Sequence, residues 1–229
     1  LEHSIDVEGT RNVLEACLRA DVGKVIVSSS GAAYGYYADN NIPLSEDDPI
    51  RGNPEFSYSD HKRQVEEMLA DWRENHPELE QLIFRPGTII GSSTRNQITD
   101  LFDRRALLAL RGSASPFVFI WDKDAVDILR RGILTDTTGI YNVAGDGVMT
   151  VHDIAARLGK RVLTLPVPVV RGALRLLRIA RLTQYGPEQV DFLRYRPVLD
   201  NRRLKEHFGY TPKKTSREAF EVFVEGRSG

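Results

Sequence analysis

Three side chains could together move a proton at a carbon–oxygen bond: Ser30, Tyr58 and Lys62. Ser30 lies in SSSGAAYG (28–35), directly after a short strand pattern, and YSDHK (58–62) opens a helix. Residues four apart share a helix face, so Tyr58 and Lys62 are expected side by side. A free tyrosine ionises near about pH 10. One ammonium about 4 Å away stabilises a phenolate by about 4 kcal/mol at an effective dielectric of roughly 20, which is enough for proton transfer near neutral pH.

Strand and helix patterns alternate around these residues. Strands are predicted at 24–29, 81–86, 117–121 and 140–145. Helices are predicted at 7–20, 58–76, 97–110, 122–135 and 150–158, and in the C-terminal third at 171–183, 187–194, 200–208 and 215–225. This alternation predicts parallel strands joined by helical crossovers. Ser30 would then lie at the carboxyl end of a strand, where open α/β sheets bind ligands.

Four motifs resemble, in order, those of the extended short-chain dehydrogenase/reductase family, in its NAD-dependent epimerase/dehydratase group. They are DVEGTRNVLEAC (6–17), KVIVSSSGAAYG (24–35), YSDHK (58–62) and FRPGTIIG (84–91). The resemblance implies an α/β fold, with a partial Rossmann-type doubly wound parallel sheet over residues 1–165. A small, mostly helical substrate lobe over residues 166–229 would be interleaved with it.

The resemblance also implies roles for individual residues. Ser30, Tyr58 and Lys62 would be catalytic, and NAD or NADP would be the cofactor. The expected cofactor contacts are Ser28, Ser29, Tyr58, Lys62, Pro86, Gly87 and Thr88. The expected substrate contacts are Tyr34, Thr88 and Phe117, although Tyr34 could equally belong to the core.

Two family features at the N-terminal side are absent from this sequence: the Gly-rich phosphate loop and the residue that selects NAD or NADP. We therefore expect that an N-terminal piece of roughly three strand–helix units has been lost or left out. We also expect weak dinucleotide binding by this chain, and the strand at 24–29 at the edge of the sheet.

Other departures concern the substrate. Asp6 and Thr88 each stand where the family motif usually has Asn. Phe117 stands where sugar-nucleotide epimerases have an Arg that holds the diphosphate. Gly31 and Ala32 replace the acidic pair that 4,6-dehydratases need for water elimination. Dehydration is therefore not expected, and a nucleotide-sugar substrate would need another basic residue at its phosphates.

The leading hypothesis is an NAD(P)-dependent epimerase or oxidoreductase that transfers hydride at a hydroxyl or carbonyl of a sugar-like substrate, nucleotide sugars included. Tyr58 would be the general acid/base, Lys62 would assist its ionisation and orient the cofactor, and Ser30 would polarise the oxygen. A carbonyl reductase of a more apolar substrate is one alternative, favoured by Phe117 and Phe119. A non-catalytic dinucleotide-binding sensor or assembly protein is another, and the intact catalytic set argues against it.

Composition limits the partners. The 229 residues carry a formal net charge of −1, which does not suggest a nucleic-acid partner. Cys17 is the only cysteine, which favours a reducing, cytoplasmic location. No apolar run approaches the roughly 20 residues of a membrane span, and the five histidines and one cysteine show no metal-ligand spacing. The resemblance makes helices 7–20 and 59–76 candidates for a homodimer contact, and the alternative is that both helices simply pack on the sheet.

Two further features have a plain and a functional interpretation. Four arginines, at 171, 175, 178 and 181, lie opposite Leu174, Leu177 and Ile179 on the helix predicted at 171–183. We interpret them as a solvated face over a small lobe. A substrate lid, or a helix that binds a membrane surface or phosphate, is the alternative. His61 should point away from the catalytic face and lie at the surface.

Overall fold

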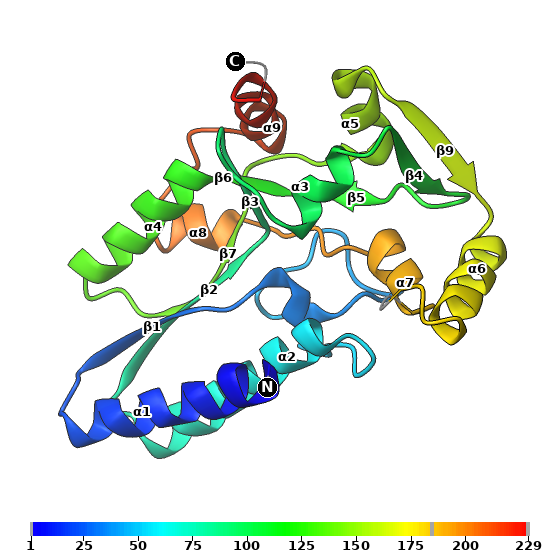
Figure 1. Cartoon of the computed structure of the whole chain (residues 1–229). Coiled ribbons are helices and arrows are strands. Elements are labelled where there is room, and N and C mark those ends of the chain that lie inside the picture. Colours follow the sequence, from blue (N-terminus) through cyan, green and yellow to red (C-terminus); the bar gives the residue numbers. More distant parts are fainter. Residues whose placement is uncertain (1, 184–185, 228–229) are drawn as a thin grey trace.

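The centre of the protein is a parallel three-stranded sheet, shown in the computed structural model of Figure 1, which describes residues 2–183 and 186–227. The strand order is β1 (Lys24–Ser28), β2 (Glu80–Pro86) and β7 (Gly139–Val143). Ser28 pairs with Phe84, and Pro86 pairs with Val143, so the carboxyl ends of the strands meet at one side. β1 lies at the edge of this sheet, as predicted.

Helices cover both faces of the sheet (Figure 1). On one face lie the π-helical turn η1 (Ser4–Glu8), α1 (Gly9–Arg19) and α2 (Ser57–Asn75), with Leu14 and Leu69 packed against Ile83. On the other face lie α4 (Asp122–Leu134) and α8 (Arg202–Glu206), with Ile128 and Leu204 packed against Leu82. Adjacent strand residues point to opposite faces, so Leu82 and Ile83 contribute to two different cores. This is the doubly wound α/β arrangement that the sequence predicts.

A second group of strands extends the fold beyond the central sheet. β3 (Thr88–Ile90) pairs in parallel with β6 (Phe119–Trp121), and β5 (Pro116–Phe117) pairs antiparallel with β8 (Met149–Thr150). The single strand predicted at 117–121 is therefore split at Val118 between two partners. Around these strands pack α3 (Gln97–Phe102), α5 (Val151–Leu158) and α9 (Ser216–Glu225).

The helix predicted at 97–110 is wrong beyond Phe102. Residues Ala106–Leu110 form β4, which pairs in parallel with β9 (Arg161–Leu165). Leu107, Ala109 and Leu110 are buried. A short apolar run fits a buried strand as well as a helix, and pairing with a distant strand decided between them here.

The C-terminal helices attach to this strand pair. α6 (Val167–Ile179) and α7 (Gln189–Arg194) pack on it through Val170 and Val190, which contact Leu110. α6 begins four residues before its predicted start, because Pro166 and Pro168 fit a helix N-terminus. This core includes residues on both sides of position 165. The predicted boundary between a domain at 1–165 and a lobe at 166–229 stays a prediction.

Candidate active site

Tyr58 and Lys62 lie together at the start of α2, beside the carboxyl end of β1. Tyr58 is 47% exposed, in the first turn of the helix. The Nζ atom of Lys62 lies 5.7 Å from the centroid of the Tyr58 ring. The same Nζ lies 3.5 Å from the carbonyl oxygen of Ser28, at the long limit of a hydrogen bond. The lysine therefore connects the tyrosine to the end of the strand.

Ser30 joins the strand to a short 3-10 helix, η2 (Gly31–Tyr34). Its Oγ accepts a hydrogen bond from the backbone nitrogen of Ala32 at 3.1 Å, which caps the helix. Ser59, next to Tyr58, donates its hydroxyl to the carbonyl oxygen of Ala32 at 2.6 Å. The first turn of α2 is thus bonded to the segment that begins at Ser30, and the three expected catalytic residues lie at one end of the sheet.

The turn after β2 lies near the same end. The backbone nitrogen of Gly87 donates to the carbonyl oxygen of Val143, and that of Thr88 donates to the carbonyl oxygen of Val118. A Cβ atom on Gly87 would come within 3.0 Å of the Val118 oxygen, so a side chain there would push the two segments apart. Pro86, Gly87 and Thr88 are half-buried, and Ser28 is exposed.

Below this surface lies a buried ion pair between Glu66 of α2 and Arg85 of β2. The Nη2 of Arg85 donates to Oε2 of Glu66 at 2.6 Å, and both side chains are 4% exposed. Ser29 donates its hydroxyl to Oε1 of the same carboxylate at 2.5 Å. Burial would lower the pKa of Arg85, but its hydrogen bonds to Glu66 and Tyr34 outweigh burial and raise the pKa. The guanidinium is therefore charged, and the pair is held by charge-assisted hydrogen bonds.

This network corrects two sequence-based expectations. The side chain of Ser29 is buried and directed at Glu66, so it does not line a cofactor cleft. Tyr34 is fully buried, and its hydroxyl is bonded to Arg85, Asn142 and the carbonyl of Ser45. Burial raises the pKa of Tyr34 to about 12. Tyr34 is therefore a core residue, not a substrate contact.

Phe117 is also buried, at 3% exposure, and the guanidinium of Arg196 lies over its ring. The Cζ of Arg196 is 3.9 Å from the centroid of Phe117 and 4.6 Å from that of Phe192. Burial lowers the pKa of Arg196 to about 9, so it carries its charge at neutral pH. Its Nε and Nη2 atoms are buried and have no hydrogen-bond partner among the described residues.

Phe117 is buried beneath this guanidinium, which corrects the expectation that Phe117 contacts the substrate. Arg196 itself was not among the expected site residues. Burial raises the pKa of the neighbouring Tyr36, Tyr58 raises it further, and the Arg196 guanidinium partly offsets the rise. The sequence did contain a hint. Phe117 stands where related enzymes have a diphosphate-binding arginine, so another basic residue was expected near the substrate phosphates. No spacing rule identifies Arg196 as that residue.

A hollow of about 590 Å³ lies beside this region. One wall comes from the segment between η2 and α2, including Tyr36, Asn53 and Phe56. The other wall comes from α6, α7 and their flanking residues, including Arg171 and Tyr195. Phe56 immediately precedes α2, so the hollow opens next to the turn that carries Tyr58.

His61 is buried, which contradicts its expected surface position. It is 7% exposed, and its Nδ1 lies 3.0 Å from Oδ2 of Asp6. The expectation failed because η1 packs against the side of α2 that would otherwise face solvent. Asp6, which stands where the family motif usually has Asn, is thus the partner of His61.

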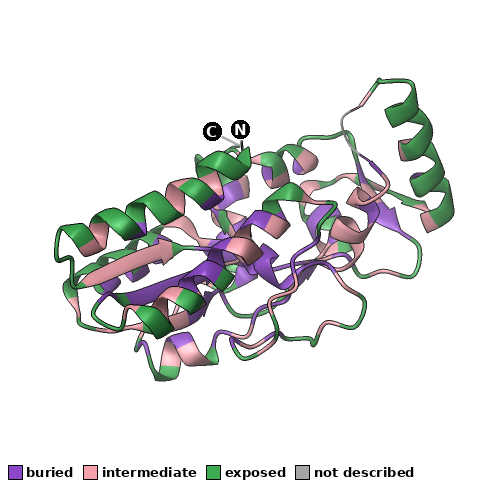
Figure 2. Cartoon of the chain, turned by 90° about the horizontal axis from the view of Figure 1, so that it is seen from below, coloured by how far each residue is buried: buried purple, intermediate pink, exposed green. Residues whose placement is uncertain are grey.

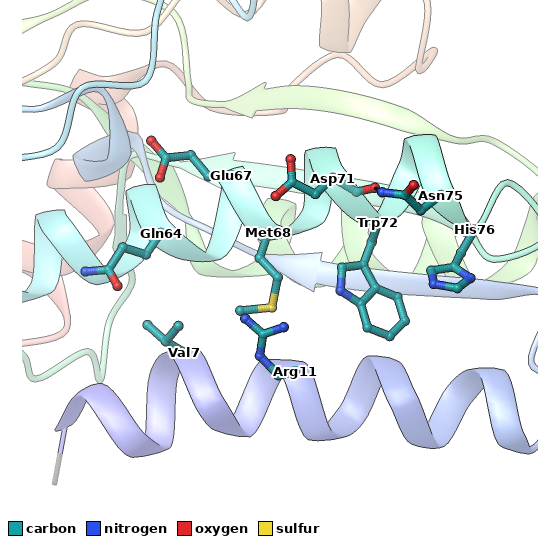
Figure 3. A pocket seen from close by; sticks show the side chains of 9 residues that line it. All are labelled: Val7, Arg11, Gln64, Glu67, Met68, Asp71, Trp72, Asn75 and His76. Carbon is teal, nitrogen blue, oxygen red and sulfur yellow. Dashed lines mark hydrogen bonds between the residues drawn. The ribbon is translucent and has the colours of Figure 1, made fainter.

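A separate groove of about 490 Å³ runs between α1 and α2 (Figure 3). Arg11 of α1 extends toward Met68 of α2 in this view, and Trp72 lies further along the groove. Glu67 and Asp71 lie along its α2 side. None of Ser30, Tyr58 and Lys62 lines it, so this groove is not part of the candidate active site.

Neither a membrane span nor a metal cluster is found in residues 2–183 and 186–227. No helix there is long and apolar enough to cross a bilayer. No group of three or more His, Cys, Asp or Glu side chains could hold a metal ion there. The cytoplasmic location stays a prediction.

The sequence matches the model of the NAD dependent epimerase/dehydratase family over residues 2–131. An uncharacterized protein of Mycobacterium tuberculosis (strain ATCC 25618 / H37Rv) is 24% identical over 228 residues, which cover 97% of this chain and 60% of that protein. The chain therefore spans about 60% of the length of this relative.

Two further proteins are similar to this chain. The N-acetyl-alpha-D-glucosaminyl-diphospho-ditrans,octacis-undecaprenol 4-epimerase of Escherichia coli O157:H7 is 34% identical over 107 residues, 46% of this chain and 31% of that enzyme. The structure of the UDP-glucose 4-epimerase of Thermus thermophilus complexed with NAD superposes with a TM-score of 0.73 at 21% identity. It covers 100% of this chain and 71% of that one. At this identity the structural likeness establishes the Rossmann-type fold.

Glu66→Gln should destabilise the protein by about 3–5 kcal/mol, because it removes a buried charge and leaves that of Arg85 unpaired. Urea unfolding measures the loss. The control is Glu67→Gln on the same helix, where the carboxylate is exposed and pairs with Arg63 at the surface. Equal stability of the two variants would show that the Glu66–Arg85 pair is not a structural constraint.

Proposed function

Because the chain belongs to the NAD dependent epimerase/dehydratase family, we propose that its protein is an NAD(P)-dependent epimerase or oxidoreductase acting on a hydroxyl or carbonyl of a sugar-like substrate. One observation carries this proposal. Tyr58 is half-exposed at the strand ends, with Lys62 between its ring and the carbonyl of Ser28. A sensor that only binds a dinucleotide would not need this arrangement.

The donor set fits the nicotinamide half of the cofactor. Lys62 and Tyr58 offer an ammonium and a hydroxyl to a ribose diol, and the Pro86–Thr88 turn offers a half-buried surface at the same end of the sheet. When NAD(P) is bound, its nicotinamide ring supplies the acceptor or donor of the hydride.

Tyr58 takes the proton of the substrate hydroxyl while the hydride leaves the same carbon, and the C–OH group becomes C=O. The reverse step returns the proton from Tyr58. Lys62 stabilises the phenolate by its positive charge. Ser30 donates a hydrogen bond to the reacting oxygen and holds it near Tyr58, since its Oγ accepts from Ala32 and still has its proton to donate.

Arg196 favours an anionic substrate over the apolar substrate of a plain carbonyl reductase. A buried guanidinium with unpaired donors is costly, and a phosphate or carboxylate oxygen would satisfy those donors. Arg196 thus supports a sugar joined to a phosphate or diphosphate. The substrates in the names of the similar enzymes, UDP-glucose and a diphospho-undecaprenol sugar, are both of this kind.

Tyr58→Phe in the full-length protein should lower kcat about a hundredfold or more, because the phenol is the only group proposed to move the proton. UDP-glucose with NAD is the assay. The control is Tyr141→Phe, since that hydroxyl donates to the carbonyl of Thr138 and takes no part in the site. Turnover of the Tyr58 variant within tenfold of the unaltered enzyme would rule out the assigned role.

Arg196→Met should raise KM for UDP-glucose about tenfold or more and change kcat much less. Methionine keeps the packing on Phe117 but offers no donors to a phosphate. Arg104→Met, at an exposed position, is the control. A purely structural role would give the opposite pattern, with unchanged KM and a less stable protein.

The groove between α1 and α2 supports a homodimer through these helices. A two-fold contact would place Arg11 of one protomer near Glu67 and Asp71 of the other, and would cover Trp72. Light scattering at micromolar concentration should give twice the monomer mass, and Arg11→Glu should give the monomer. Arg104→Glu should leave the dimer intact. A monomeric unaltered chain would contradict this interface.

A further inference from the structure

Helix α6 projects from the body of the protein, at the opposite end from α1 (Figure 1). In Figure 2 this helix, at the right, is coloured as exposed along most of its length. Val170 is its one buried residue, and Leu174 and Val167 are half-buried beside it. The rest of the helix surface therefore faces solvent.

That solvent-facing surface carries large apolar side chains. Val169 is 55% exposed, Leu176 is 69% exposed and Ile179 is 72% exposed. Spacings of seven and three residues place these three along one side of the helix. Leu182, just after the helix, is 75% exposed. Leu177 and Ile179 were expected to face the lobe, and their exposure corrects that expectation.

The same region has a strong positive charge. Between residues 154 and 187 the sequence contains seven Lys and Arg residues and no Asp or Glu, although the formal net charge of the whole chain is −1. Arg171 and Arg178 pair with Asp191 and Glu188, the acidic residues next to this helix. Arg175 and Arg181 are exposed and form no ion pair within the part of the chain that the structure describes.

We propose that α6 and the turn to Leu182 dock on the surface of an anionic lipid membrane. Val169, Leu176, Ile179 and Leu182 would enter the boundary between headgroups and acyl chains, while Arg175 and Arg181 contact lipid phosphates. The positive charge of this face favours a membrane over a second copy of the chain as the partner. Two copies of this face would bring their arginines together, whereas anionic headgroups neutralise them. The proposal does not depend on the proposed catalytic activity.

Vesicle co-sedimentation tests the proposal directly. The protein should bind phosphatidylcholine vesicles that contain about a quarter phosphatidylglycerol at least about tenfold more strongly than pure phosphatidylcholine vesicles. Arg175→Glu with Arg181→Glu should remove that preference. Leu176→Ser with Ile179→Ser should weaken binding about tenfold or more even at low salt, because insertion and charge both contribute.

The control is the pair Arg130→Glu and Ile133→Ser on α4, where both residues are likewise exposed. It makes the same kinds of change on a different surface and should bind like the unaltered protein. Circular dichroism melting checks that every variant is folded. Failure of the unaltered protein to bind anionic vesicles, or equal loss of binding in the α4 control, would overturn the proposal. A change of mass by light scattering in the α6 variants, without vesicle binding, would assign this face to self-association instead.

Discussion

The buried contact between Glu66 and Arg85 holds together the three segments that carry the site. Glu66 lies one turn after Lys62 on α2, Arg85 lies just before the Pro86–Thr88 turn, and Ser29, which donates to the same carboxylate, lies just before Ser30. The end of β1, the end of β2 and helix α2 thus meet at one carboxylate. Breaking a buried pair leaves an uncompensated charge, so this geometry tolerates little variation. Tyr58 lies on the same helix as Glu66, so the ion pair also anchors the helix that carries Tyr58.

The features that the sequence predicts well are those with local causes. Alternating strand and helix periods predict β1, β2, β7, α2 and α4, and the parallel arrangement follows from the crossovers. The spacing of Tyr58 and Lys62 predicts a shared helix face, and the end of the first strand places Ser30 at the ligand side of the sheet. Each of these features follows from local sequence patterns and from their order along the chain.

The features that were wrong or overlooked depend on partners far away in the sequence. Ala106–Leu110 is a strand because β9 lies beside it, and His61 is buried because Asp6 comes from another helical segment. Ser29 and Tyr34 face inward because their hydroxyls form buried hydrogen bonds, Ser29 with Glu66 and Tyr34 with Arg85. Arg196 lies over Phe117 because the fold brings together two segments that are far apart in the sequence. Periodicity and motif spacing carry no information about such pairs, so a single sequence cannot supply them.

Two positively charged features lie outside the proposed catalytic residues. Arg196 has buried donors with no partner among the described residues, and we propose that they bind a phosphate-linked substrate. Helix α6 carries the exposed arginines and apolar side chains that we propose dock on an anionic membrane. The reaction proposed for this protein is hydride transfer at the Ser30–Tyr58–Lys62 site. Its most direct test is the near-ultraviolet absorbance of the nicotinamide in the NAD-loaded full-length protein, recorded after rapid mixing with UDP-glucose or with UDP alone. Absorbance of reduced nicotinamide should appear with UDP-glucose and not with UDP. Bound NAD that stays oxidised with every phosphate-linked sugar offered, UDP-glucose included, would rule out hydride transfer at this site and favour a protein that only senses the dinucleotide.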